Sequence, residues 1–274
     1  MNRSSESACE SKRKEVPSFN ILDQIVARKR VELEVEKRRL SPAELKEAVI
    51  SNSTKDFRAA LLARECAIIA EVKRKSPSKG ALREITDPAS VAIEYEKCGA
   101  SAISVLTDKH FFEGDSSDLI RVRESTTLPI LRKDFIIDPY QVFESKLLGA
   151  DSLLLIASLL GPALGGFVKL SESLGLHPLV EIHSEDDLAL AVEAGARMIG
   201  INNRNLKTFQ TDIRKSMELM PLIPEGIVVV SESGIRSRQE IHALMDAGIH
   251  AFLIGEGLMR ANDIGLKFRE LLPS

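Results

Sequence analysis

Short runs of apolar, often β-branched residues recur along most of this chain at intervals of roughly 20 to 35 residues, the length of a strand, a helix and their loops. Eight such runs lie at 67–72, 102–106, 129–131, 152–156, 178–182, 198–201, 227–230 and 251–254. Between them, segments 88–97, 139–148, 185–194 and 239–247 carry apolar residues three or four positions apart, which is the helical period. The pattern predicts strands that alternate with helices in a parallel α/β fold.

Glycine marks the expected end of four of these helices. Gly99, Gly149, Gly195 and Gly248 each stand shortly before the next strand, where glycine readily adopts the positive φ that ends a helix. Eight strand–helix units in about 210 residues predict a (β/α)8 TIM barrel. An open, doubly wound sheet is the alternative, but it normally has five or six strands and one dominant glycine-rich loop.

The first 66 residues stand outside this repeat. We expect residues 1–17, rich in Ser, Glu, Lys and Arg, to be a disordered tail, and residues 18–66 to form a helical extension of the barrel at 67–274. One helix is predicted over 21–40, and a second begins at Ser41-Pro42. The extension either packs on the barrel as a solvated layer or forms a lid over the substrate pocket. The basic clusters 12–14 and 28–30 lack interleaved aromatic residues, so we interpret them as solvated faces rather than an RNA site.

Charge and cysteine content narrow the class of protein. A net charge of −3 argues against a nucleic-acid partner, and no apolar stretch approaches the length of a membrane span. Residues 1–17 lack the apolar core of a secretory signal, and three widely spaced cysteines suit neither a disulfide framework nor a zinc site. We therefore expect a cytoplasmic protein, with a monomer as the default.

Ionisable and amide residues gather where the predicted strands end. Glu71 and Lys73 end the first strand, and strand alternation places them on the same side. In a parallel barrel the carboxyl ends of the strands face the ligand. A lone charge there is more often solvated or salt-bridged, but several around one axis must pair with each other or bind something charged. The others follow strands three, five, six and seven: Lys133, Glu181, Asn202, Arg204 and Glu232.

Glycines after the last two strands indicate a phosphate site. Ser233-Gly234 follows the seventh strand, and Gly255-Glu256-Gly257 follows the eighth and opens a short helix at Leu258. Backbone N–H groups can approach phosphate oxygens closely at such positions; a plain tight turn is the alternative. The five histidines lack metal-ligand spacing, and nucleotide-binding motifs are absent, so we expect no metal and no cofactor. The sequence thus predicts lysine–glutamate acid–base chemistry on a phosphorylated small molecule.

Five segments, in this order, resemble the indole-3-glycerol-phosphate synthase family. They are Glu71-Val-Lys-Arg-Lys-Ser-Pro-Ser-Lys-Gly80, Leu131-Arg-Lys-Asp-Phe135, Leu179-Val-Glu-Ile-His183, Gly200-Ile-Asn-Asn-Arg-Asn-Leu206 and Ser231-Glu-Ser-Gly-Ile235. The resemblance covers nearly the whole chain, from Ile21 to Arg260. It implies a carboxy-lyase of tryptophan biosynthesis that converts 1-(o-carboxyphenylamino)-1-deoxyribulose 5-phosphate to indole-3-glycerol phosphate, with loss of carbon dioxide and water and without a metal.

The resemblance also implies roles for individual residues. Lys133 would be the general acid of ring closure, Glu181 would serve in dehydration with Glu71 as a nearby carboxylate, and Lys73 would contact the substrate and assist dehydration. Asn202 joins this catalytic set. The implied substrate-binding residues are Ser76, Phe112, Phe135, Arg204 and Glu232, and the implied phosphate-binding residues are Ser233, Gly234, Gly255 and Glu256. By position, Phe111, Phe112, Phe135 and Leu131 are available as an apolar wall, and whether Phe111 or Phe112 faces the substrate stays open.

Other functions compete with this interpretation. A phosphoribosylanthranilate isomerase would typically carry a cysteine after strand one, where this chain has Glu71 and Lys73. A non-catalytic barrel that senses a sugar phosphate would keep the glycines after strands seven and eight but not the set of Lys133, Glu181 and Asn202. A former half of a bifunctional enzyme is a third possibility, although the length leaves no room for a second barrel.

Overall fold

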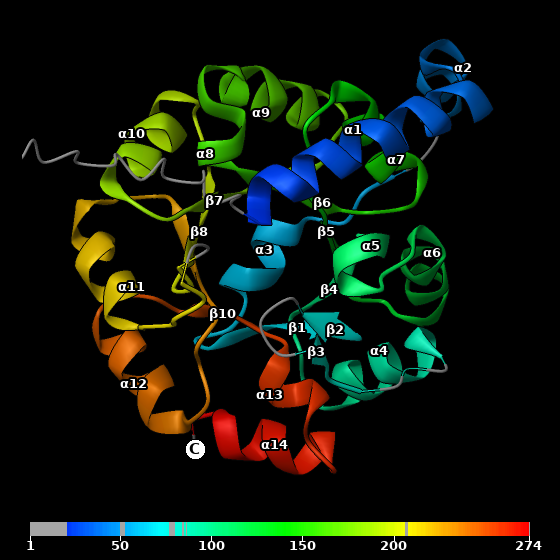
Figure 1. The fold of residues 1–274 in the computed structure, drawn as a ribbon. Helices are drawn as coiled ribbons and strands as arrows, with labels where there is room; N and C mark the ends of the chain where they lie inside the picture. The colour runs from blue at the N-terminus through cyan, green and yellow to red at the C-terminus, as the bar shows by residue number, and fades with distance from the viewer. Residues whose placement is uncertain are drawn as a thin grey trace, which may run out of the picture.

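Eight parallel strands close into a barrel in the computed structural model of the protein, which describes residues 21–49, 53–76, 80–83, 85, 87–205 and 208–273 (Figure 1). The strands are β1 (Ala67–Val72), β4 (Ala102–Leu106), β5 (Ile130–Lys133), β6 (Ser152–Ile156), β7 (His177–Ile182), β8 (Met198–Asn202), β9 (Val228–Glu232) and β10 (Ala251–Ile254). Each pairs with the next, and β10 closes the ring on β1, with Ala251 opposite Ala67. The predicted TIM barrel is confirmed. The tail expected at 1–17 and the basic cluster 12–14 lie outside the described residues.

Several strands extend beyond the apolar runs that predicted them. β5 continues to Lys133, which pairs with Leu106, and β9 continues to Glu232, which pairs with Asn202. Backbone pairing therefore continues past the apolar residues, because the last side chains of these strands face the cavity instead of the core. Lys133 and Glu232 thus stand on the barrel wall rather than in loops. Beyond β1, the short strands β2 (Lys75–Ser76) and β3 (Gly80–Ala81) form a separate antiparallel pair.

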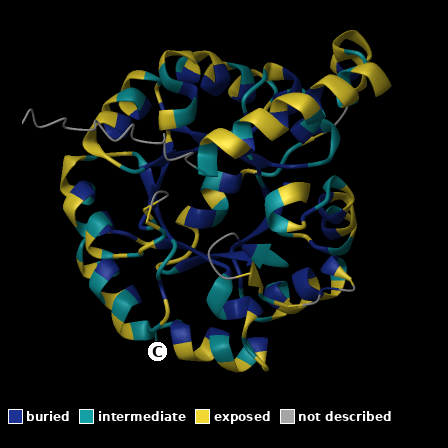
Figure 2. Ribbon diagram, viewed as in Figure 1, coloured by how far each residue is buried: buried dark blue, intermediate teal, exposed yellow. Residues whose placement is uncertain are grey.

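Helices cover the outside of the barrel, with exposed outer faces and buried inner faces (Figure 2). Three of these helices begin at side-chain caps: Asp87, Asp138 and Ser184 accept hydrogen bonds from backbone N–H groups in the first turns that follow them. The four predicted glycines have φ between 78° and 93°. The helices are α4 (Pro88–Lys97), α5 (Lys109–Phe112), α6 (Ser116–Ser125), α7 (Pro139–Leu147), α8 (Ala157–Leu160), α9 (Leu164–Ser173), α10 (Glu185–Glu193), α11 (Arg214–Leu219), α12 (Arg238–Asp246), α13 (Glu256–Met259) and α14 (Ile264–Leu271), with 3-10 turns at Gly161–Ala163 and Met220–Leu222.

The amino-terminal end of the barrel is closed by α3 (Phe57–Leu62). Its buried side chains Phe57 and Leu61 pack on the first residues of the strands, such as Ala67 and Ala102. Further along the barrel axis, Ile69 and Leu131 fill the interior. A second apolar layer lies between the strands and the surrounding helices. The interior is therefore a packed core, and the carboxyl end of the barrel is left for a ligand.

The amino-terminal extension crosses that carboxyl end. Helix α1 (Ile21–Arg39) lies over the barrel, and α2 (Pro42–Ala48) follows it, beside α7 (Figure 1). Ser41 opens α2 with a reciprocal capping box to Glu44, as the Ser-Pro signal predicts. The interpretation of 28–30 as a solvated face is wrong for Lys29, which is 6% exposed, because this lysine pairs with Asp108 and Asp134 in the loops after β4 and β5. None of the described helices is long and apolar enough to cross a membrane.

Candidate active site

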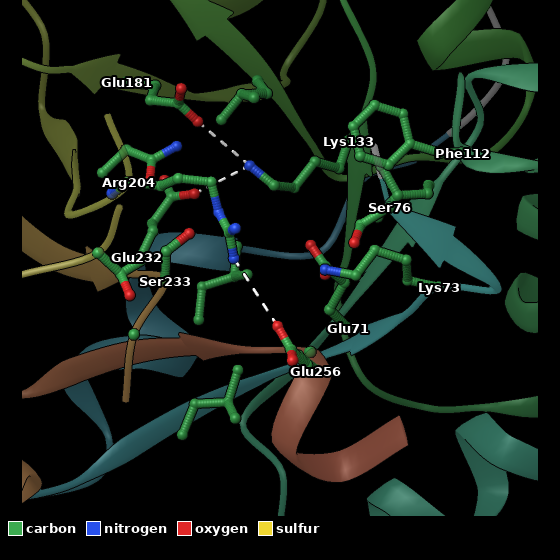
Figure 3. A pocket seen from close by; sticks show the side chains of 18 of the residues that line it. Glu71, Lys73, Ser76, Phe112, Lys133, Glu181, Arg204, Glu232, Ser233 and Glu256 are labelled. Carbon is green, nitrogen blue, oxygen red and sulfur yellow. Dashed lines mark hydrogen bonds and ion pairs between the residues drawn. The ribbon is translucent and has the colours of Figure 1, made fainter. Parts of the chain in front are cut away.

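A cavity of about 530 Å³ opens at the carboxyl end of the strands. Every residue to which the sequence analysis gave a catalytic, substrate-binding or phosphate-binding role lines it. These side chains come from different strand ends and from the loops that follow them, and they converge on one space (Figure 3). The barrel therefore brings together residues that are far apart in the sequence, as strand-end positions predict.

Lys133 lies at the centre of the charged residues. Its Nζ donates hydrogen bonds to Glu181 Oε2 at 3.2 Å and to Glu232 Oε2 at 2.9 Å (Figure 3). Burial alone would lower the pKa of Lys133, but the charges of Glu232, Glu181 and Glu71 raise it above its ordinary value. Lys133 is therefore a cation with a proton held at a fixed position in the cavity.

The two carboxylates that contact Lys133 differ in protonation. Burial would raise the pKa of Glu181, but Lys133 and His183 lower it below its usual range. Burial raises the pKa of Glu232 to about 7, because Lys133 offsets the burial only in part and Glu181 adds repulsion. Glu181 is thus a stable carboxylate, whereas Glu232 is a carboxyl group that titrates near neutral pH.

A second ion pair stands at the end of β1. Lys73 Nζ contacts Glu71 Oε1, in line with the predicted placement of both residues on one side of the strand. Gly255, after β10, leaves space for this pair, since a Cβ atom there would lie 2.1 Å from Glu71 Oε1. Lys73 and Lys133 therefore share one side of the cavity with the carboxyl groups of Glu71, Glu181 and Glu232. The charges of Glu181 and Glu71 add to the burial that raises the pKa of Glu232.

The loops after β9 and β10 form the end of the cavity where phosphate is expected. Ser233 has a φ of 66° and Gly234 a φ of 86°, so two successive residues have left-handed backbone. This conformation is rare for serine, and it points successive N–H groups toward one side. Helix α13 begins at Glu256 rather than at Leu258, because Gly255 is its cap residue. The Glu256 carboxylate pairs with Arg204 at 3.8 Å and with Arg260 at 3.5 Å.

The opposite end of the cavity is apolar. Phe112 on α5 and Phe135 after β5 line it, with ring centroids 6.0 Å apart. Phe111 instead packs edge-on against His110, at 4.9 Å between centroids, and does not line the cavity. Leu131 lies in the barrel core, so its expected place in this wall is wrong, because its position on β5 points it down the axis. Ile21, Leu22 and Ile25 of α1 complete the wall, together with Leu106, Leu154 and Ile156.

Comparisons with known proteins agree with this geometry. A family model described as indole-3-glycerol phosphate synthase matches residues 22–271. The indole-3-glycerol phosphate synthase of Alkaliphilus metalliredigens is 47% identical to this chain, over 92% of this chain and 97% of that protein. The protein of the same name from Dehalococcoides mccartyi is 48% identical, over 92% of this chain and 100% of that protein. In Carboxydothermus hydrogenoformans the identity is 51%, over 84% of this chain and 85% of the relative.

The chain belongs to the indole-3-glycerol phosphate synthase family.

Solved structures show the same fold at much lower identity. The N-acetylmannosamine-6-phosphate 2-epimerase of Clostridium perfringens superposes with a TM-score of 0.59 at 18% identity, covering 81% of this chain and 100% of that one. A thiamine phosphate pyrophosphorylase from Pyrococcus furiosus gives 0.58 at 15% identity, covering 77% and 95%. These likenesses show the barrel alone, whereas membership in the indole-3-glycerol phosphate synthase family rests on the sequence relatives.

Two features of this family member escaped the sequence analysis. His183 Nε2 lies 2.9 Å from Glu181 Oε1, so Glu181 is held by His183 on one oxygen and by Lys133 on the other. Burial would lower the pKa of His183, but Glu181 raises it. The two-residue spacing from Glu181 on β7 was the available signal, because alternate residues share a face. The second feature is the identity of the α1 residues in the cavity wall: the sequence analysis allowed the extension to form a lid over the pocket, but it did not single out Ile21, Leu22 and Ile25 as lining residues.

Some polar atoms in the cavity face no protein partner. Among the described residues, Ser76 Oγ and Glu232 Oε1 are buried without a hydrogen-bond partner. Both residues belong to the lining of the cavity. No group of three or more described His, Cys, Asp or Glu residues is arranged to hold a metal ion.

Proposed function

We propose that this chain converts 1-(o-carboxyphenylamino)-1-deoxyribulose 5-phosphate to indole-3-glycerol phosphate, carbon dioxide and water. The observation that carries this proposal is the cation of Lys133, held between Glu181 and Glu232. Its cavity has an aromatic wall at one end and, at the other, the loop in which Ser233 and Gly234 have left-handed backbone conformation. The proposed substrate has matching parts, with an aromatic acid at one end, a phosphate at the other and a ketone between them.

The two ends of the cavity support one orientation of the substrate. Its aromatic ring would lie against Phe112, Phe135 and the apolar residues of α1. Its phosphate would bind at Ser233 and Gly234 and at the start of α13, where backbone N–H groups would donate to the phosphate oxygens. Arg204 and Lys73 supply positive charge for the carboxylate and phosphate. The ketone then lies near Lys133.

Ring closure needs a proton at the ketone oxygen. As the ring carbon that bears the carboxylate attacks the ketone carbon, the carbonyl π electrons move to oxygen, and Lys133 Nζ donates its proton there. The carboxylate then leaves as carbon dioxide, and its bonding electrons restore the aromatic ring. The product of this step is a ring-closed alcohol, with Lys133 left neutral among carboxyl groups that favour its reprotonation.

Dehydration completes the reaction. The hydroxyl group leaves as water when it receives a proton, and a proton leaves the neighbouring ring carbon so that the indole double bond forms. Glu181 is the proposed base, because its low pKa keeps it ionised, and Lys73 assists the departure of water. Asn202, which hydrogen-bonds Glu181, would orient that carboxylate and the leaving hydroxyl group. Positioning and acid–base catalysis thus account for both steps.

The test is indole fluorescence after addition of the substrate to the purified protein. The chain contains no Trp, so product emission rises from a low background. We expect Lys133→Ala to lower kcat by a factor on the order of 10² to 10⁴ while KM changes little. Lys169→Ala, on the exposed face of α9, is the control and should match the wild type.

Four outcomes are informative. Emission from the wild type but not from Lys133→Ala supports the reaction and the acid. Emission from both proteins contradicts the role of Lys133, and equal losses in affinity and rate would make Lys133 a binding residue instead. Tight binding without product in the wild type would indicate a barrel that senses a sugar phosphate. A cytoplasmic location, a monomeric state and a phosphorylated substrate as the sole partner stay predictions of the sequence.

A further inference from the structure

Lys29 is a buried lysine on a helix that otherwise presents charges to solvent. Its Nζ lies 2.9 Å from Asp134 Oδ1, 3.1 Å from Asp108 Oδ2 and 3.2 Å from Glu32 Oε2, and its side chain is 7% exposed. Lysine is rarely buried unless it is paired. Asp108 and Asp134 belong to two different barrel loops, so this single ammonium group joins α1 to both of them.

Asp108 determines where α5 begins. It is the cap residue of α5, and its Oδ1 accepts a hydrogen bond from Phe111 N at 2.8 Å while its Oδ2 accepts from Lys29. Helix α5 carries Phe112 into the cavity wall. The ammonium group of Lys29 therefore holds the carboxylate that orients the helix of Phe112.

Asp134 performs the corresponding task after β5. Its Oδ1 accepts from Phe135 N at 2.8 Å as well as from Lys29, and its Oδ2 accepts from Thr107 Oγ1 at 2.7 Å. Burial would raise the pKa of Asp134, but Lys29 and Arg132 lower it below its usual range. Asp134 is thus an ionised anchor between Lys133 and Phe135, the second aromatic residue of the wall.

The same helix supplies the facing part of the wall. Ile25 stands four residues before Lys29, one turn away on the same side of α1, and Ile21 and Leu22 lie a further turn toward the amino end. All three line the cavity. The position of Lys29 along α1 consequently fixes the distance between these apolar residues and the two phenylalanines.

We propose that Lys29 is a positioning residue that sets the shape of the aromatic end of the substrate cavity, by pinning α1 to the loops that carry Phe112 and Phe135. This inference rests on the proposed function for the identity of the aromatic ligand. Lys29 does not line the cavity and acts through Asp108, Asp134 and α1.

The experiment separates the two ends of the cavity. Lys29→Met keeps an unbranched side chain without charge, and it should raise KM for the proposed substrate about tenfold, the factor that corresponds to about 1.4 kcal/mol. The binding of anthranilate, measured by calorimetry, should weaken by a similar factor, whereas the binding of inorganic phosphate should stay within twofold of the wild type. Lys37→Met is the matched control, because Lys37 is also on α1 and pairs with Asp138 at 2.7 Å outside this cavity.

A second variant guards against simple loss of folding. The double variant Lys29→Met/Asp108→Asn removes one of the carboxylates that Lys29→Met leaves without its lysine partner, while the asparagine oxygen can still cap α5. This double variant should fold more stably than Lys29→Met and keep the selective loss of anthranilate binding. Equal weakening of both ligands, or the same behaviour in Lys29→Met and Lys37→Met, would overturn the proposal. Since calorimetry needs no turnover, an inactive wild type would refute the proposed reaction without deciding the role of Lys29.

Discussion

Replacement of Gly200 by alanine is a sharp test of how the site is built. Gly200 lies in β8, opposite Glu181 on β7, and its backbone φ is not in the positive region, so its conformation suits any residue. A Cβ atom there would lie 2.1 Å from Glu232 Oε1 and 3.2 Å from its Cδ. The carboxylate of Glu232 therefore occupies the space that every other residue at position 200 would need.

The structure gives the magnitude of the effect. Glu232 cannot retreat freely, because its other oxygen is hydrogen-bonded to Lys133 at 2.9 Å. Overpacking of this kind costs about 1–3 kcal/mol. If the displaced carboxylate perturbs Lys133 in the transition state by a similar amount, kcat/KM falls by a factor of roughly 5 to 150. We expect Gly200→Ala to fold, to unfold at a lower temperature and to lose activity within that range.

Gly166→Ala is the matched control. Gly166 lies inside α9, and a Cβ atom there would meet nothing within 4 Å. Alanine in a helix interior should raise the free energy of unfolding by about 0.5–1 kcal/mol and leave kcat/KM unchanged. Thermal unfolding and the indole fluorescence assay compare the two variants. If Gly200→Ala behaved like Gly166→Ala in both measurements, the close approach of Glu232 to position 200 would not matter for stability or activity, and the prediction would be refuted.

Two further predictions concern pH and stability. The folded-state pKa of Glu232 is raised to about 7 from 4.5, so its contribution to the free energy of unfolding is lost as pH rises through about 7. Denaturant titrations should therefore show Glu232→Gln gaining stability relative to the wild type between about pH 4.5 and 7. A stability difference between the two proteins that does not change with pH would contradict the raised pKa. At the amino-terminal end, Asp151 accepts hydrogen bonds from Arg123 at 2.7 Å and from the backbone N–H groups of Lys55 and Ile130. Asp151→Ala should destabilise the fold by about 3–5 kcal/mol, because it removes one partner of a buried ion pair, and it should leave kcat/KM at low temperature within about threefold. A large loss of activity with unchanged thermal unfolding would contradict a purely structural role for Asp151.

The barrel was predictable from the sequence because each strand is a local apolar run and each of four helices ends at a glycine. The site was predictable for a related reason: parallel strands deliver their last residues to one rim, so Lys133 and Glu181 meet although 48 positions separate them. The place of Lys29 was not predictable, because its partners Asp108 and Asp134 are distant in the sequence and each also has a local role. The choice between Phe111 and Phe112 depends on where Asp108 starts α5, and residue types alone do not determine it.

The closure of the amino-terminal end of the barrel by α3 determines how substrate and products enter and leave the cavity. With Phe57 and Leu61 sealing that end and Ile69 and Leu131 filling the axis above them, the cavity is a cup rather than a channel. Substrate must enter, and indole product, carbon dioxide and water must leave, through the same mouth beside α1. Entry of the next substrate therefore has to wait for departure of the last product, and a tighter fit of α1 over the mouth would slow both passages together.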